Sequence, residues 1–482
     1  MKILIFDRFI MRLFSVVTTK LTLILLLFLT VYTSLSQASL PDLEANKDER
    51  SLSNPSYVLG QYWFRKLNGS RALIDFPPAY DYFKDTLALL LPQTDLYNKK
   101  VELTFLNSSQ SNAFVIPGNH MFLYSDIMEM ITNEDMLLGL LAHELAHLDL
   151  KHYERQTQRS NEEMQKTLTM LGAGIAAALA GAGGDTTSAL WLGGIANQAE
   201  NKLTYSRQQE QEADRRGRDY LQQADLNPNG MTQLFQAFFK KALGRPKLEF
   251  LSTHPSPESR MSDTFSITTK ETLLHQKDNT EFEFFRASLL AYRAGLEERP
   301  YLYLTQQIHH TDAGYFAKAL FAYLVQSPKR ALTYLQQIEI QNRYSQYLLA
   351  LSLAASEQID SAIQVTEKAL NLAPKNIYFS MLNAQLTQTQ PKKLKAEYLY
   401  QKRALWRANI QFYQSINNKS MPLYYRALLD FNRGKEKTAK ILLNRAIKNA
   451  KNQELDLLKS TDKKFNNIIS AEKVENLKEE KS

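Results

Sequence analysis

Two histidines four residues apart, His143 and His147, stand on either side of a glutamate, Glu144, within an apolar stretch of the chain. Because positions i and i+4 lie on one face of an α-helix, both imidazoles can reach the same metal ion. Glu144 follows the first histidine directly, and from there its carboxylate can hold and deprotonate a water at that metal. This spacing predicts zinc-dependent peptide hydrolysis, with one Zn²⁺ per chain and Glu144 as the general base.

A polar run around residue 210 offers the third protein ligand that a catalytic zinc site requires. The run is typical of a helix, on which Glu210 and Asp214 stand at i and i+4 and share a face, while Glu212 points nearly opposite. We therefore expect Glu210 to bind the metal. Asp214 would accept a hydrogen bond from the outer nitrogen of a ligand histidine and fix its tautomer. The alternative is a surface charge cluster, of which Glu212 is a plausible member.

A further histidine, His152, follows His147 by five residues. Metzincin peptidases place their third histidine six residues after the second, with a glycine between them. Leu150 stands where that glycine would be. We therefore exclude His152 as a metal ligand.

The elements that hold these residues in place are also indicated by the sequence. An apolar helix is predicted over 136–150, and the polar residues 132–135 before it form a helix start signal. A small sheet leads directly into this helix, with a Pro117-Gly118 turn between two of its strands. The predicted N-terminal helices cover residues 48–93. The predicted strands cover residues 101–106, 113–116 and 121–124.

The N-terminus is typical of an export signal. Four basic residues precede the apolar run Leu21–Tyr32, and Ser36-Gln37-Ala38 has small residues at the two positions that a signal peptidase reads. We predict a signal peptide at 1–38 and a periplasmic mature protein. An uncleaved inner-membrane anchor is the alternative, because the basic region is long, although the apolar run is short for a membrane span. The chain has no cysteine, which excludes thiolate zinc sites and disulfides.

The stretch 168–196 is dominated by Ala, Gly and Leu and is interrupted by glycines, so it does not predict one membrane-spanning helix. It fits two apolar helices joined by a flexible turn. Core packing, a lid beside the active site and contact with lipid are the three interpretations that it leaves.

After about Thr272, Gly and Pro become rare and the spacing becomes helical. A tetratricopeptide pattern follows, in which two helices cross at small residues and a proline comes after the second helix. We predict a zinc metalloprotease domain at 39–275, a tetratricopeptide repeat domain at 276–464 and a charged, disordered tail at 465–482. The residues that carry the repeat pattern are Tyr347, Ala362, Ala369, Leu370, Leu372 and Pro374, with weaker copies around Ala331 and around Tyr424, Gly434, Ala439 and Ala446.

Positive charge is concentrated in the C-terminal part. The formal net charge is +8, and residues 391–464 alone hold 18 Lys or Arg against 6 Asp or Glu. This asymmetry favours an anionic partner for the repeat domain, with a solvated helical surface as the alternative. We expect no nucleic-acid partner.

The two metal motifs together resemble a known peptidase group. His-Glu-x-x-His at 143–147, followed about sixty residues later by Ser-Arg-x-x-Glu-x-x-Ala-Asp at 206–214, is similar to the gluzincin peptidases related to the CAAX prenyl protease. The chain resembles the exported branch of that group over nearly its whole mature length. The resemblance implies a mainly α (α+β) fold, in which a gluzincin domain with a small β-sheet precedes an all-α tetratricopeptide domain.

The resemblance also assigns roles to residues. It implies that His143, His147 and Glu210 bind zinc. His254, in a Leu-Ser-Thr-His-Pro loop, resembles a histidine that caps the zinc as a fourth ligand and holds the enzyme latent. Arg260, six residues later, resembles the residue that stabilises the tetrahedral oxyanion.

One further stretch, Asn112-Ala113-Phe114, resembles a strand that borders the cleft. An extended substrate can pair with such a strand by β-augmentation.

We therefore expect a periplasmic zinc metalloendopeptidase that degrades misassembled outer-membrane β-barrel precursors and has a chaperone-like role in their assembly. The resemblance implies that the repeats hold unfolded or stalled β-barrel proteins or their assembly machinery, with peripheral contact to a membrane. A rival hypothesis is a non-enzymatic repeat adaptor or chaperone with a latent or structural zinc site. A third is a membrane-anchored protease that uses the Ala/Gly-rich stretch as a lipid contact.

Overall fold

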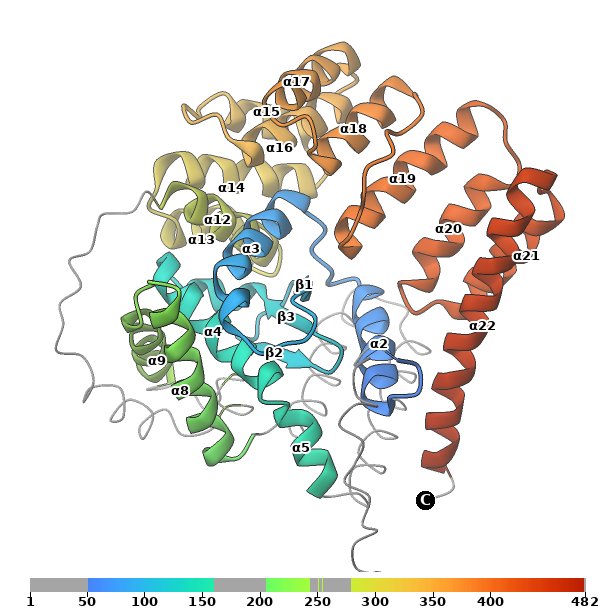
Figure 1. The fold of residues 1–482 in the computed structure, drawn as a ribbon. Coiled ribbons are helices and arrows are strands. Elements are labelled where there is room, and N and C mark those ends of the chain that lie inside the picture. Colours follow the sequence, from blue (N-terminus) through green and yellow to red (C-terminus); the bar gives the residue numbers. More distant parts are fainter. Residues whose placement is uncertain (1–50, 160–204, 243–249, 251–253, 255–278, 481–482) are drawn as a thin grey trace, which may run out of the picture. The chain divides into compact units, whose positions relative to one another are not determined.

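A three-stranded sheet forms the base of the metal-binding region (Figure 1). Strand β1 (Glu102–Leu106) pairs in parallel with β3 (His120–Tyr124), and β2 (Ala113–Ile116) pairs antiparallel with β3, which gives the order β1-β3-β2. The β2–β3 connection is tight because Gly118 and Asn119 both have positive φ, 87° and 59°. The three predicted strands are confirmed within one residue at each end.

The computed structural model describes residues 51–159, 205–242, 250, 254 and 279–480, all of which fall in one structural unit, Arg50–Ser482. The predicted signal peptide, the Ala/Gly-rich stretch 168–196 and the boundary between residues 275 and 276 lie outside these residues. Within the described residues, no helix combines the length and the apolar character that crossing a membrane requires.

The predicted metal-binding helix is α4 (Glu134–Asp149), which begins two residues before the predicted start, within the predicted start signal. The side chain of Asn133 caps the helix by accepting a hydrogen bond from the backbone N–H of Met136. Two acidic residues in the first turn interact favourably with the positive end of the helix dipole. Every residue from 136 to 147 is buried, so α4 is a core helix whose histidines face protein on all sides.

Helices α8 (Arg207–Gln223) and α9 (Asn229–Ala242) pack against α4. The contact is close enough to require glycine: a Cβ on Gly139 of α4 would lie 2.6 Å from the backbone N of Met231, and one on Gly217 of α8 would lie 3.0 Å from the carbonyl carbon of Ala142. This close approach brings the carboxylates of α8 to the histidines of α4. The other elements of this region are α2 (Pro55–Asn68), α3 (Pro77–Leu90), η2 (Leu91–Gln93), η3 (Ser125–Glu129) and α5 (His152–Arg159).

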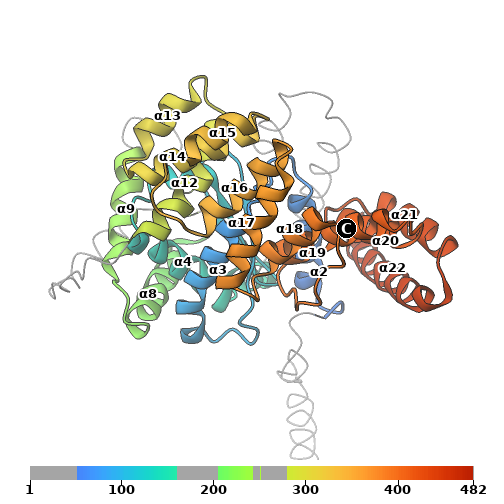
Figure 2. The same ribbon diagram turned by 90° about the horizontal axis from the view of Figure 1, so that it is seen from above.

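The C-terminal half is all helical, and each helix from α14 to α21 packs against the next (Figure 1 and Figure 2). The alanines that the sequence places at helix crossings, Ala331, Ala362 and Ala439, are completely buried on the second helix of a pair. Together with the sheet, these helices confirm the mainly α fold class. The helices are α12 (Thr280–Ala294), α13 (Pro300–Gln307), α14 (Thr311–Leu324), α15 (Pro328–Leu335), α16 (Arg343–Ala355), α17 (Ile359–Leu372), α18 (Ile377–Thr387), α19 (Leu399–Ser415), α20 (Met421–Phe431) and α21 (Glu436–Lys448).

The tail predicted at 465–482 begins within a helix of the structure. Helix α22 runs from Asn452 to Glu480. Leu458, Phe465 and Glu472 recur at seven-residue intervals and are buried, so the many charges occupy the other faces of the helix. Phe465 stacks on Phe431 with ring centroids 3.7 Å apart, and Glu472 forms a buried ion pair with Arg65 of α2.

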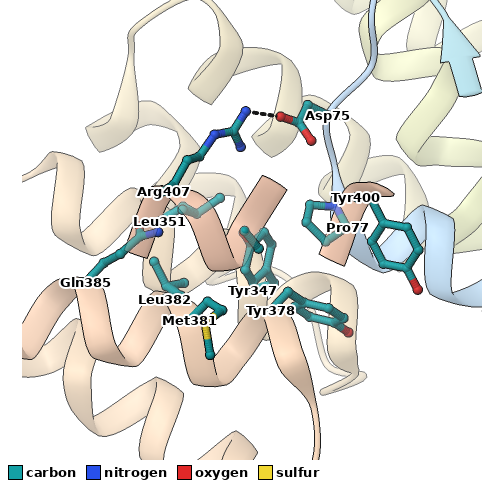
Figure 3. Close-up of a pocket in the computed structure, with 11 residues that line it drawn as sticks. Asp75, Pro77, Tyr347, Leu351, Tyr378, Met381, Leu382, Gln385, Tyr400 and Arg407 are labelled. Carbon is teal, nitrogen blue, oxygen red and sulfur yellow. Dashed lines mark hydrogen bonds and ion pairs between the residues drawn. The ribbon is translucent and has the colours of Figure 1, made fainter. Parts of the chain in front are cut away.

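A pocket of about 120 Å³ lies where the segment before α3 meets the repeat helices (Figure 3). An ion pair between Asp75 and Arg407 closes one side of it. Burial alone would raise the pKa of Asp75, but the charges of Arg403 and Arg407 outweigh burial and lower the pKa to about 2. The pocket is lined by Asp75, Pro77, Tyr347, Leu351, Tyr378, Met381, Leu382, Gln385, Tyr400, Ala404 and Arg407.

Candidate metal centre

Four metal-ligating side chains from three separate parts of the chain meet between α4 and α8. His143 and His147 come from α4, Glu210 from the first turn of α8, and His254 from beyond α9. Each offers one ligand atom, and these atoms all lie within 4.8 Å of one another. All four residues are at most 1% exposed. We call them the donor cluster.

The spacing of the donor atoms fits a tetrahedral zinc ion. Ligands about 2.0–2.1 Å from zinc at tetrahedral angles lie about 3.3 Å from one another. Nε2 of His143 lies 3.1 Å from Nε2 of His147 and 3.3 Å from Nδ1 of His254. Glu210 Oε1 lies 3.4 Å from His147 Nε2 and 3.0 Å from His254 Nδ1. Two imidazoles, one carboxylate and a third imidazole form a donor set that zinc accepts.

Glu144 is completely buried beside the donor cluster. Its Oε1 lies 3.5 Å from Nε2 of His254, whose other nitrogen, Nδ1, belongs to the cluster. His254 therefore contacts the candidate base and the candidate metal ligands at the same time. The ring of Phe250 stacks on His254 with centroids 4.4 Å apart, and the backbone N–H of His254 donates to the carbonyl of Phe250.

Asp214 lies behind His143. Its Oδ1 is 2.9 Å from Nδ1 of His143, on the side of the ring away from the donor cluster. This is the contact that the i, i+4 spacing of Glu210 and Asp214 predicts. Asp214 is 2% exposed, so water competes little for this contact.

His152 lies outside the donor cluster, at the first position of α5, but it is completely buried and contacts His147. Its Nδ1 is 2.9 Å from Nδ1 of His147, and its Nε2 is 3.2 Å from Oε2 of Glu212. Burial lowers the pKa of His152 despite its contact with the Glu212 carboxylate. Burial opposes the charged form of Glu212, but hydrogen bonds from Arg155 and His152, together with the charge of Arg155, lower its pKa overall.

Sequence reasoning gave no role to Tyr205 or Phe250, and both contact the metal centre. Tyr205 is 2% exposed, and its ring stacks on His147 with centroids 3.9 Å apart and an angle of 21°. Burial and the nearby carboxylates of Glu144 and Glu210 raise the pKa of Tyr205 well above its ordinary value. Its place directly before the Ser206 cap of α8 is the one signal that the sequence offers.

The predicted substrate strand is β2, and β2 is an edge strand of the sheet, paired on one side with β3. Ala113 and Phe114 lie in β2, and Asn112 directly precedes it; β2 also packs against α4. Arg260 lies outside the described residues.

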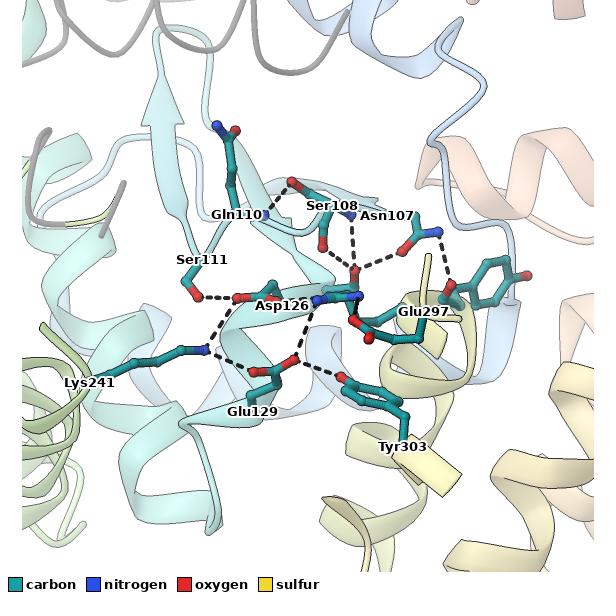
Figure 4. Close-up of polar contacts among 12 residues, drawn as sticks. Asn107, Ser108, Gln110, Ser111, Asp126, Glu129, Lys241, Glu297 and Tyr303 are labelled. Atoms are coloured by element: carbon teal, nitrogen blue, oxygen red, sulfur yellow. Dashed lines mark hydrogen bonds and ion pairs between the residues drawn. The ribbon is translucent and has the colours of Figure 1, made fainter. Parts of the chain in front are cut away.

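A buried polar network holds the loop before β2 (Figure 4). Asp126 of η3 accepts hydrogen bonds from Ser111 and from Nε of Arg293 on α12, the latter at 2.7 Å. Lys241 of α9 lies 3.4 Å from Asp126 and 2.9 Å from Glu129. The carbonyl of Ser111 in turn accepts a hydrogen bond from the backbone N–H of Phe250. This network, which we call the η3 network, therefore fixes the segment that also contacts His254.

Comparison with known proteins agrees with this geometry. Residues 82–266 match the model of peptidase family M48. The chain is 29% identical over 230 residues to the β-barrel assembly-enhancing protease of Escherichia coli K12, a match that covers 47% of each protein. It is 25% identical over 263 residues to the putative β-barrel assembly-enhancing protease of Vibrio cholerae, covering 54% of this chain and 53% of that protein.

A third relative is the mitochondrial metalloendopeptidase OMA1 of Schizosaccharomyces pombe, 29% identical over 218 residues, which cover 44% of this chain and 59% of that protein. The chain thus spans about half the length of the curated relatives it matches. The matched segment 82–266 includes the donor cluster and Glu144. Residues 82–266 therefore resemble a metallopeptidase domain of family M48.

Proposed function

We propose that this chain is a zinc-dependent endopeptidase in which His143, His147 and Glu210 bind the metal. The observation that carries the proposal is that these three donors converge next to Glu144, a buried glutamate on the helix that holds the two histidines. Zinc supplies Lewis acidity to a peptide carbonyl and to a water when it is bound. Glu144 takes the proton from that water and delivers it to the nitrogen of the leaving amine.

The edge strand β2 supports a role in substrate binding. An edge strand has backbone N–H and C=O groups that an extended peptide can pair with. The segment Asn112–Phe114 would therefore hold the substrate beside α4 in an extended conformation. In this proposal, Arg260 stabilises the oxyanion that forms when the carbonyl is attacked.

His254 supports a latent resting state. It donates an Nδ1 atom to the donor cluster and places Nε2 near Glu144, so it occupies the position that a substrate carbonyl or a water needs. We propose that His254 must leave this position before peptide cleavage begins. Its contacts with Glu210 and His143, at 3.0 and 3.3 Å, are those that have to break.

We further propose that the enzyme acts in the periplasm on outer-membrane β-barrel precursors. The names of the E. coli and V. cholerae relatives, together with the signal-like N-terminus, support this role. The stacked helices from α12 to α21 would act as tetratricopeptide repeats that hold stalled precursors or their assembly machinery. A chaperone-like activity independent of cleavage follows from such a holding surface.

A second candidate function is a non-enzymatic adaptor, and the position of His254 favours it. A site with four protein donors resembles a structural zinc site, which lacks an open position. In that case the repeats alone would carry the function.

Cleavage assays with full-length zinc-loaded variants separate the two functions. The substrates are casein and an unfolded β-barrel outer-membrane protein. We expect Glu144→Gln to abolish cleavage, and His254→Ala to cleave faster than the wild type because its fourth position is open. His309→Ala, which changes an exposed histidine, is the matched control. The enzyme proposal fails if zinc-bound His254→Ala cleaves no better than Glu144→Gln.

A further inference from the structure

The two histidines of α4 are supported from behind in different ways. Nδ1 of His143 contacts a carboxylate directly, that of Asp214. Nδ1 of His147 contacts another imidazole, His152, whose far nitrogen Nε2 contacts the carboxylate of Glu212. The support of His147 thus passes through one more ring and ends at a side chain that is 29% exposed.

The atoms allow one consistent placement of the protons along this path. Nε2 of His147 faces the donor cluster, so a neutral His147 that binds metal there carries its proton on Nδ1. Nδ1 of His152 must then accept that hydrogen bond, which places the proton of His152 on Nε2. That N–H donates to Oε2 of Glu212. The hydrogen-bond path from each histidine of α4 therefore leads to a carboxylate, directly for His143 and through His152 for His147.

The outer part of the path is itself held in place. Nη1 of Arg155 donates to Oε2 of Glu212 at 2.9 Å, and Nε2 of Gln208 donates to Oε1 at 3.2 Å. Nε2 of Gln209 donates to the backbone carbonyl of His152 at 3.0 Å. A carboxylate with three partners and a buried imidazole with both nitrogens in contact form an ordered arrangement. A surface charge cluster would not need a completely buried histidine at its centre.

We propose that His152 and Glu212 are positioning residues for the metal ligand His147. They fix its tautomer and ring orientation and increase the basicity of Nε2, so that the site holds zinc more tightly than the four donors alone would. Residues that orient ligand histidines in this way typically change metal affinity by about 10–100-fold when they are lost. This inference rests on the proposed function, since it needs a metal at Nε2 of His147.

The test measures the zinc dissociation constant of full-length protein by competition with a zinc chelator. We expect His152→Leu to weaken zinc binding by about 10–100-fold, because leucine can neither accept from His147 nor donate to Glu212. His152→Gln should recover most of the affinity, because a glutamine side chain offers both an acceptor and a donor. Glu212→Met should weaken binding by about tenfold, and Glu212→Gln by less, since its amide oxygen still accepts from His152.

Two further measurements separate positioning from a general loss of folding. The visible absorption spectrum of the cobalt(II)-substituted protein should shift in His152→Leu and return toward that of the wild type in His152→Gln. Glu367→Met, at an exposed glutamate of α17, is the matched control for Glu212→Met and should leave the zinc affinity unchanged. Because Glu212 is partly exposed, its variants decide the question even if His152→Leu fails to fold.

The outcomes distinguish this inference from the proposed function. A wild-type protein that does not bind zinc, or binds it without His143 and His147, overturns both. A wild type that binds zinc at those histidines, with His152→Leu and Glu212→Met binding it equally tightly, overturns the positioning role and leaves the proposed function intact.

Discussion

Among the described residues, two groups of acidic side chains have partners of different kinds. In the η3 network, Asp126 and Glu129 contact Arg293 and Lys241, so the cations belong to the chain. At the candidate metal centre, Glu210 and Asp214 contact imidazoles. The spacing of the donor cluster fits a bound ion, which would contribute positive charge to these buried carboxylates.

The two groups of side chains therefore have different roles, one structural and one chemical. A network that carries its own cations is complete when the chain folds, and it can only hold elements together. A cluster of metal donors is coupled to the ion that it binds, so we expect its stability and its activity to depend on metal. We therefore expect changes at the candidate metal centre to alter zinc binding and activity, and changes in the η3 network to alter the free energy of unfolding alone.

Removal of a donor should have the largest effect. We expect His147→Ala to lower cleavage by at least about a thousandfold, because the site loses the ion that supplies several kcal/mol of transition-state stabilisation. Activity and zinc content measured on the same sample check this, with His254→Ala as the background so that latency does not mask the change. An active, zinc-loaded His147→Ala protein would contradict the role of the donor cluster.

Removal of the metal should lower the free energy of unfolding of the native state. At free zinc about a thousand times its Kd, a bound ion contributes about 4 kcal/mol to the free energy of unfolding. Denaturant unfolding with zinc and with a chelator measures this contribution. We expect Asp126→Asn to show the same zinc-dependent difference as the wild type, and His147→Ala to show none. An equal difference in His147→Ala would place the stabilising metal elsewhere.

Breaking the η3 network should reduce stability without affecting metal affinity. Asp126→Ala leaves the buried Arg293 without its most buried carboxylate partner, which we expect to lower the free energy of unfolding by about 3 kcal/mol. The zinc Kd should stay within about twofold of the wild type. Glu297→Gln removes a more exposed partner of the same arginine and should cost less than about 1 kcal/mol. A large change in zinc Kd for Asp126→Ala would show that the two sites are coupled.

Asp75, like Asp126 and Glu129, is an acidic residue paired with cations of the chain. Its ion pairs make the stability of the protein depend on pH. Its pKa is lowered from 3.8 to about 2, so its stabilisation is fully present above pH 4 and is lost as the pH falls toward 2. The shift corresponds to about 2 kcal/mol. Asp75→Asn should remove this part of the acid-induced loss of stability, whereas Asp360→Asn, at an exposed aspartate of α17, should not. Identical acid unfolding of Asp75→Asn and the wild type would contradict the assignment.

The sequence predicts those parts of the site that depend on local periodicity. His143 and His147 share a helix face, and so do Glu210 and Asp214, because one helical turn separates each pair. The contact of His152 with His147 depends instead on a left-handed residue, Lys151 with φ of 50°, which turns the chain so that α5 begins beside α4. No local pattern predicts that turn.

The order of α22 could not be predicted for a related reason. Its charge suggested disorder, and its burial depends on partners far away in the sequence, such as Arg65 and Phe431. Residues in separate elements of the fold leave no periodic signal in one another. The same reason explains why no role is predicted for Tyr205, since its role is set by the ring of His147 on another element.

Anomalous diffraction at the zinc edge, from crystals of the purified full-length protein, tests the central claim most directly. Our account predicts one zinc ion per chain, bonded to Nε2 of His143, Nε2 of His147 and a carboxylate oxygen of Glu210, with Nδ1 of His254 in the fourth position. A zinc-replete protein with no anomalous peak between α4 and α8, or with its peak at other residues, would contradict the account.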